Sequence, residues 1–166
     1  MKNGVNGIGS IMDGNFPLVD IHPREYPVPY SRTVCIPVVN TKRSYDLPDS
    51  DFWRDKLILG ISMRKQDGSN TRFSKNGTLL IPQTWLGRGF IRLTQNSTQV
   101  VENLPLEHLV HEPGQGALSY AQIIMEGGFS ASSSGIEFAG TDALPGGPFD
   151  VELVFYFVPM SKLCAQ

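Results

Sequence analysis

Apolar residues in this chain occur mainly in short runs separated by turn residues, a pattern typical of β-strands. The clearest run is residues 151–158, which is almost wholly apolar, follows a Pro-Gly-Gly-Pro turn at 145–148 and ends at Pro159. Aromatic and β-branched residues suit a pleated surface. A run without polar alternation predicts a strand that is buried on both faces.

The segment 30–82 predicts further strands. Residues 33–39 form an extended run in which Pro37 favours a sheet edge or a bulge, because proline donates no hydrogen bond to a ladder. Residues 56–64, then 71–74 and 78–82 around the turn Asn76-Gly77, predict a meander of three strands. In the first of these, period two places one set of residues on a single face: Leu57, Leu59, Ile61 and Met63.

The remaining chain continues this pattern with one exception. Residues 89–94 and 98–103 predict a pair of strands joined near Asn96-Ser97, and strands are also predicted at 121–126 and 135–139. The exception is 105–112, the best helical candidate. Short strands without βα alternation predict an all-β fold, an antiparallel β-sandwich for which a jelly roll is favoured over an immunoglobulin-like arrangement.

The domain organisation follows from a change in composition near residue 30. Residues 1–30 are rich in glycine and proline and predict an extended N-terminal arm, whereas 31–166 predict a single β-sandwich domain. Within the arm, four residues are candidate anchors for contact with a neighbouring protein: Phe16, Pro17, Tyr26 and Tyr30.

The charge, the apolar runs and the cysteines of the chain argue against several classes of protein. Charged residues make up 18% of the chain, the formal net charge is -2, and no basic cluster of the kind needed for phosphate contacts is present, which argues against direct nucleic-acid binding. No run approaches the roughly 20 apolar residues of a transmembrane segment, and residues 1–12 do not resemble a signal peptide. Cys35 and Cys164 could form one disulfide, but two unpaired thiols in a reducing compartment are the favoured interpretation.

Candidate chemistry is sparse. On a short helix His108 and His111 lie three residues apart and would offer two imidazoles to a metal, as in a cupin-like enzyme, but the spacing of known zinc motifs is missing. We therefore expect no catalytic residues, no metal site and no cofactor. Trp53 and Trp85 are alternative ligand-binding candidates, since indole rings can stack on sugars in a carbohydrate-binding jelly-roll module.

The arm at 1–30 followed by the strand succession from Thr33 to Val158 resembles the single jelly-roll coat and vertex (penton) proteins of tailless icosahedral viruses, including lipid-containing bacteriophages. The resemblance lies in the pattern of the whole chain. It implies a structural virion protein, made in the host cytoplasm, that self-assembles into a symmetric shell. The implied partners are further copies of the chain and other virion proteins.

Overall fold

The protein is an all-β sandwich, as the sequence predicts. The computed structural model describes residues 29–39, 41–48, 51–66, 73–110, 120–140 and 148–162. Four short helical segments accompany the strands: α1 (Gln83–Leu86), η1 (Leu106–Leu109), η2 (Ala131–Ser133) and η3 (Met160–Lys162). The strands are β1 (Tyr30–Val38), β2 (Ser44–Asp46), β3 (Lys56–Arg64), β4 (Gly89–Gln95), β5 (Thr98–Pro105), β6 (Ala121–Met125), β7 (Gly135–Phe138) and β8 (Phe149–Pro159).

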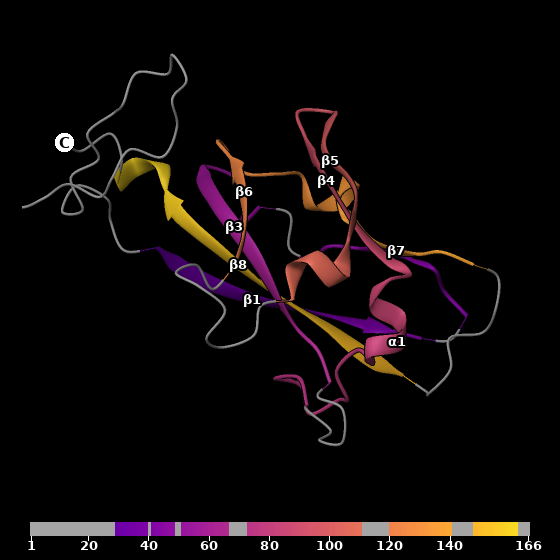
Figure 1. Ribbon diagram of the computed structural model, residues 1–166. Coiled ribbons are helices and arrows are strands. Elements are labelled where there is room, and N and C mark those ends of the chain that lie inside the picture. The colour runs from indigo at the N-terminus through magenta and orange to yellow at the C-terminus, as the bar shows by residue number, and fades with distance from the viewer. Residues whose placement is uncertain are drawn as a thin grey trace, which may run out of the picture.

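The strands form two four-stranded antiparallel sheets (Figure 1). Sheet A has the order β1-β8-β3-β6 and sheet B the order β2-β7-β4-β5. The pairing is nested: β1 pairs with β8, β2 with β7, β3 with β6 and β4 with β5. The chain is therefore arranged as a long hairpin whose tip is the β4–β5 turn and whose arms cross from one sheet to the other.

The longest strand, β8, lies in the middle of sheet A between β1 and β3. Its odd-numbered residues from Phe149 to Phe157 are buried in the hydrophobic core. Its even-numbered residues Asp150 and Glu152 point to the opposite face and are also buried, each 2% exposed. The predicted burial on both faces is confirmed for the start of the strand, whereas Val154 and Tyr156 on the outer face are half-buried.

An aromatic cluster fills the space between the sheets. The Trp53 ring lies 4.9 Å from that of Phe129, 4.6 Å from that of Phe155 and 4.8 Å from that of Phe52, measured between centroids. Aromatic pairs at such spacing add to the stabilisation from burial alone. Gly128, at φ 75°, passes so close to the backbone carbonyl of Trp53 that a Cβ there would overlap it.

The hairpin tip and the proline edge are placed as predicted. β4 and β5 are joined by Asn96 and Ser97, which both adopt positive φ values of 48° and 64°, as a two-residue hairpin turn requires. Pro37 lies in β1, at the edge of sheet A, where its missing N–H costs no ladder bond.

The predicted face of residues 56–64 is wrong in its first half. The pairing of β3 with both neighbours shifts between Ile58 and Gly60, so a β-bulge at Leu59 interrupts the alternation. Ile58 is consequently fully buried with Ile61, whereas Leu57 and Leu59 are half-buried.

Within the described residues, the predicted meander and the predicted helix are both reduced to short elements. Residues 73–80 form only isolated bridges, Phe73 with Leu79 and, in parallel, Leu80 with Asp150 of β8. The helix predicted at 105–112 is the single 3-10 turn η1, since Pro105 still belongs to β5 and Val110 is already extended. We call residues 73–80 the strap.

Candidate functional site

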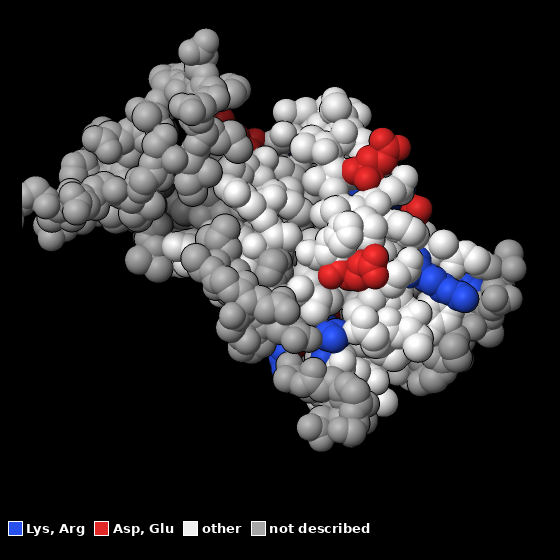
Figure 2. All heavy atoms as spheres, viewed as in Figure 1, with Lys and Arg blue, Asp and Glu red and all other residues white. Residues whose placement is uncertain are grey.

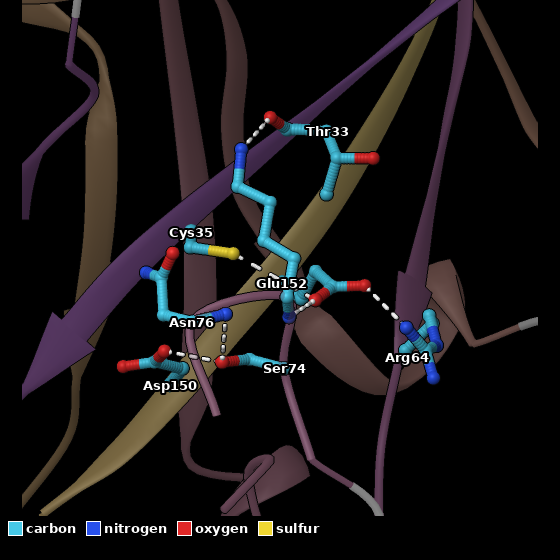
Figure 3. A network of polar contacts seen from close by, with 8 residues as sticks. Thr33, Cys35, Arg64, Ser74, Asn76, Asp150 and Glu152 are labelled. Carbon is cyan, nitrogen blue, oxygen red and sulfur yellow. Dashed lines mark hydrogen bonds and ion pairs between the residues drawn. The ribbon is translucent and has the colours of Figure 1, made fainter. Parts of the chain in front are cut away.

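The most elaborate polar arrangement among the described residues is the contact between the strap and the outer face of sheet A. Figure 3 shows side chains from β1, β3, β8 and the strap pointing toward one another at this place. Asp150 and Glu152 are the two carboxylates at its centre. A buried carboxylate is costly unless hydrogen bonds or a cation satisfy it, so each of its partners contributes to holding the strap in position.

Asp150 fixes the strap through both its side chain and its backbone. Its Oδ2 accepts a hydrogen bond of 2.6 Å from the hydroxyl of Ser74. Its backbone N–H donates to the carbonyl of Leu79 at 2.7 Å, and its carbonyl accepts from Ile81 at 3.0 Å. The strap therefore has one defined register along β8.

Glu152 collects donors from three different segments. Its Oε1 accepts a hydrogen bond of 2.7 Å from the guanidinium of Arg64 at the end of β3, in an ion pair. Its Oε2 accepts from the backbone N–H of Lys75 at 2.8 Å and from the thiol of Cys35 at 3.7 Å. One side chain thus connects β1, β3 and the strap across the outside of the sheet (Figure 3).

The environment of Cys35 suppresses its reactivity. Burial raises the pKa of the thiol from 9.0 to about 11, and the negative charge of Glu152 contributes further. Because the thiolate is the reactive form, a thiol that remains protonated at neutral pH is a weak nucleophile and a weak metal ligand. The cysteine serves as a half-buried hydrogen-bond donor, whereas Cys164 lies outside the described residues.

We call the two carboxylates of Asp150 and Glu152, together with their partners Cys35, Arg64, Ser74 and Lys75, the lock. The Ser74 hydroxyl donates to the Asp150 carboxylate and accepts from the backbone N–H of Asn76 at 3.1 Å, so it is held by hydrogen bonds in both of its roles. Among the described residues no group of three or more His, Cys, Asp or Glu side chains is placed to hold a metal ion. What the arrangement does is clamp the strap onto β1, β3 and β8.

Two hollows lie beside this lock along β1. One of about 270 Å³ is bordered by Arg32, Cys35 and Lys75, and the other, of about 420 Å³, by Cys35, Lys42 and Tyr45. The Tyr45 hydroxyl of β2 bonds to the backbone of Val39 at 2.9 Å, which keeps the β1 and β2 edges side by side. No other described strand pairs with the outer edge of β1 or of β2.

The residues predicted as ligand-binding sites are dispersed. His108 is exposed on η1, and His111 lies outside the described residues, so the pair is not brought together here. Trp53 and Trp85 are 1% and 2% exposed, and neither presents a ring face on which a sugar could stack. Both indoles instead pack in the core, Trp53 on Phe129 and Trp85 edge-on to Phe138.

Among the predicted arm anchors, only Tyr30 falls within the described residues. Its ring stacks on Phe157 at a centroid distance of 5.9 Å and its side chain is 44% exposed at the start of β1. Phe16, Pro17 and Tyr26 lie outside the described residues.

Sequence reasoning missed the lock. The sequence does contain an indication of this cluster, because Asp150 and Glu152 alternate with apolar residues at the start of an otherwise apolar strand. Carboxylates at every second position of a central strand must either face solvent or find buried partners. The partners, Ser74 and Arg64, are distant in sequence and form no local motif.

Comparison of the chain with known protein families, curated proteins and solved structures found no match in any of the three. Among the described residues, no helix is both long enough and apolar enough to cross a membrane.

Proposed function

We propose that this protein is a structural subunit of a virion, a coat or vertex protein that acts by self-assembly into a symmetric shell. The observation that carries the proposal is the nested antiparallel pairing of β1 with β8, β2 with β7, β3 with β6 and β4 with β5. This order supports a jelly roll, an architecture used by viral capsid subunits and also by lectins and cupins.

The packing between the two sheets favours a capsid subunit over a lectin or a cupin. Trp53, Phe129 and Phe155 pack against one another and fill part of the core between the sheets. The tryptophans that a sugar site would need are buried. A subunit that works by contact with copies of itself requires a rigid body and complementary surfaces rather than a ligand-binding cavity.

Exposed apolar side chains at the sheet edges add support. Tyr30, Val39, Val100 and Ile124 are 44%, 46%, 47% and 61% exposed, and all lie in or next to the edge strands β1, β5 and β6. Unpaired strand edges bearing apolar groups invite further association. In a shell, neighbouring subunits and other virion proteins would cover them, and the arm at residues 1–30 would extend to an adjacent protein.

The test is the molar mass of the purified protein by light scattering over a range of concentrations, combined with electron microscopy of the largest species. The expected result is a defined oligomer or closed particle. A variant lacking residues 1–25 should keep the circular dichroism spectrum of a folded β protein while forming smaller oligomers. A full-length protein that remains monomeric at every concentration would overturn the proposal.

A further inference from the structure

Two opposite edges of the sandwich differ in charge. We define the basic edge as β1 and β2 with the segment 42–48 and Lys75, and the acidic edge as β5 and β6 with η1 and Glu126. In both sheets these strands are the outermost ones, β1 opposite β6 and β2 opposite β5. The side chain of Gln95, at the end of β4, bonds to the carbonyl of Gly128 at 2.8 Å and so joins the turn after β6 to sheet B.

The basic edge carries its cations around the two hollows. Of the charged residues that border the hollows, Arg32, Lys42 and Lys75 are basic and Asp46 alone is acidic. Lys42 is exposed, with its ammonium 5.1 Å from the centroid of the Tyr45 ring. Lys75 is exposed as well and reaches the Thr33 carbonyl of β1 at 2.9 Å. Both ammonium groups are therefore held at the strand edge rather than extended into solvent.

The acidic edge owes its charge to an asymmetry of the sequence. Between Arg92 and Lys162 the chain contains no lysine and no arginine. Glu102 on β5, Glu107 on η1 and Glu126 after β6 are exposed, and the strands β5 and β6 themselves contain no lysine or arginine. Figure 2 shows acidic atoms near β5, and basic atoms on the same face toward β7 and α1.

Each edge also has apolar side chains suited to the centre of an interface. The basic edge has Val39, 46% exposed, between the end of β1 and Lys42. The acidic edge has Val100, placed in the irregular part of the β4–β5 pairing, and Ile124 of β6, which at 61% is the most exposed large apolar residue described. An apolar centre with a charged rim is the usual composition of a specific protein interface.

We propose that the partner of the basic edge is the acidic edge of a second copy of this chain, so that subunits join head to tail. The inference rests on the proposed function and names the surface through which self-assembly occurs. A two-fold contact of like edges would place cations against cations or carboxylates against carboxylates, whereas a head-to-tail contact pairs opposite charges in every copy. Such a contact repeats around a ring when its rotation closes.

The test uses two full-length charge-reversal variants. One carries Lys42→Glu and Lys75→Glu, which makes both edges acidic, and the other carries Glu102→Lys and Glu126→Lys, which makes both edges basic. We expect each variant alone to associate at least about tenfold more weakly than the native chain at low ionic strength, because like charges then face each other. Mixed in equal amounts, they should restore the native molar mass.

The matched control is Arg54→Glu, a charge reversal in the turn before β3, where the exposed Arg54 guanidinium pairs with Asp51 at 3.5 Å. This control should assemble as the native chain does. Circular dichroism of every variant separates loss of folding from loss of association. Raising the salt concentration should weaken assembly of the native chain, since exposed charges are screened.

The outcomes are distinct. Variants that are folded and assemble like the native chain, or a mixture that fails to restore assembly, would overturn the head-to-tail interface while the native oligomer still supports the proposed function. A native chain that remains monomeric would overturn both. Restoration only in the mixture, with an unaffected Arg54→Glu control, establishes the interface.

Discussion

The two faces of β8 are buried by different chemistry. On the inner face Phe155 and Phe157 pack in an aromatic cluster, whereas on the outer face Asp150 and Glu152 bind the strap through hydrogen bonds and an ion pair. Apolar packing is non-directional and scales with the area buried, but a buried carboxylate requires each of its donors in place. The inner face therefore supplies most of the stability, and the outer face determines where the strap lies.

The inner face should respond most strongly to truncation. Phe155→Ala removes a fully buried ring from the cluster, and we expect the free energy of unfolding to fall by about 3–5 kcal/mol. Urea denaturation followed by fluorescence would measure it. The matched control is Phe73→Ala, because Phe73 is 54% exposed on the strap, and its effect should be within about 0.5 kcal/mol. Equal losses for the two variants would contradict the assignment of the core.

Glu152→Gln tests the outer face with little change in volume. The substitution removes the negative charge that pairs with Arg64. The new amide nitrogen of the glutamine would also face one of the two donors, Arg64 or the Lys75 N–H. We therefore expect the free energy of unfolding to fall by about 2–3 kcal/mol. Glu137→Gln is the matched control. Arg92 and Glu137 form an ion pair of similar length, 2.9 Å, but the Glu137 side chain is 45% exposed. The control should lose less than about 1 kcal/mol; the opposite ranking would argue against the lock.

Ser74→Ala should loosen the strap while leaving the sandwich folded. The change leaves the buried Asp150 carboxylate without its hydroxyl donor, and we expect a loss of about 1–2 kcal/mol. Hydrogen exchange measured by mass spectrometry should speed up in peptides covering 73–80 and remain unchanged in β4. The exposed Ser132, replaced by alanine, gives the reference. Unchanged exchange in the strap would show that this bond does not hold it.

The smallest expected effect is a pH dependence that arises from Cys35. Its pKa is 9.0 when unperturbed and about 11 in the folded protein, so between these values the folded state binds the proton more tightly than the unfolded state. Stability should therefore decline as the pH rises from about 9 to about 11. The slope in this window should be steeper for the native chain than for Cys35→Ala.

Thiol reactivity gives an independent measurement of the same shift. In a Cys164→Ser background, alkylation of Cys35 should be slow at neutral pH and accelerate toward pH 11, whereas the unfolded protein should react at lower pH. Equal rates in the folded and unfolded protein at neutral pH would exclude the raised pKa.

The contrast between the two faces also explains which parts of the structure the sequence predicts. The β8 strand and the Asn96-Ser97 hairpin were predicted because apolar runs and turn residues carry their signal locally. The bulge at Leu59 was not, since a register shift depends on both neighbouring strands. The strap was predicted as part of a meander because its partners, Asp150 and Glu152, lie more than 70 residues away along the chain.

The candidate sites follow the same rule. Histidine and tryptophan were chosen as candidates because of their chemistry, in the pairs His108 with His111 and Trp53 with Trp85. Whether two such residues lie together, or are exposed, depends on the fold. The charge difference between the edges is written in the sequence as a stretch without cations after Arg92. The sequence does not show, however, that these residues lie on one edge of the sandwich. That follows from the strand order, which places β1 and β2 opposite β6 and β5.

The nested strand order has a consequence for when a newly made chain becomes competent to assemble. β8 joins β1 to β3, and neither of these strands pairs with the other. During translation, sheet A therefore stays incomplete until residues 149–159 have left the ribosome, although β4 and β5 can already form their hairpin. The basic edge, to which β1 belongs, is thus completed after the acidic edge, whose strands β5 and β6 pair with β4 and β3. In the proposed head-to-tail assembly, a partly synthesised chain would therefore offer an acidic edge but no finished basic edge.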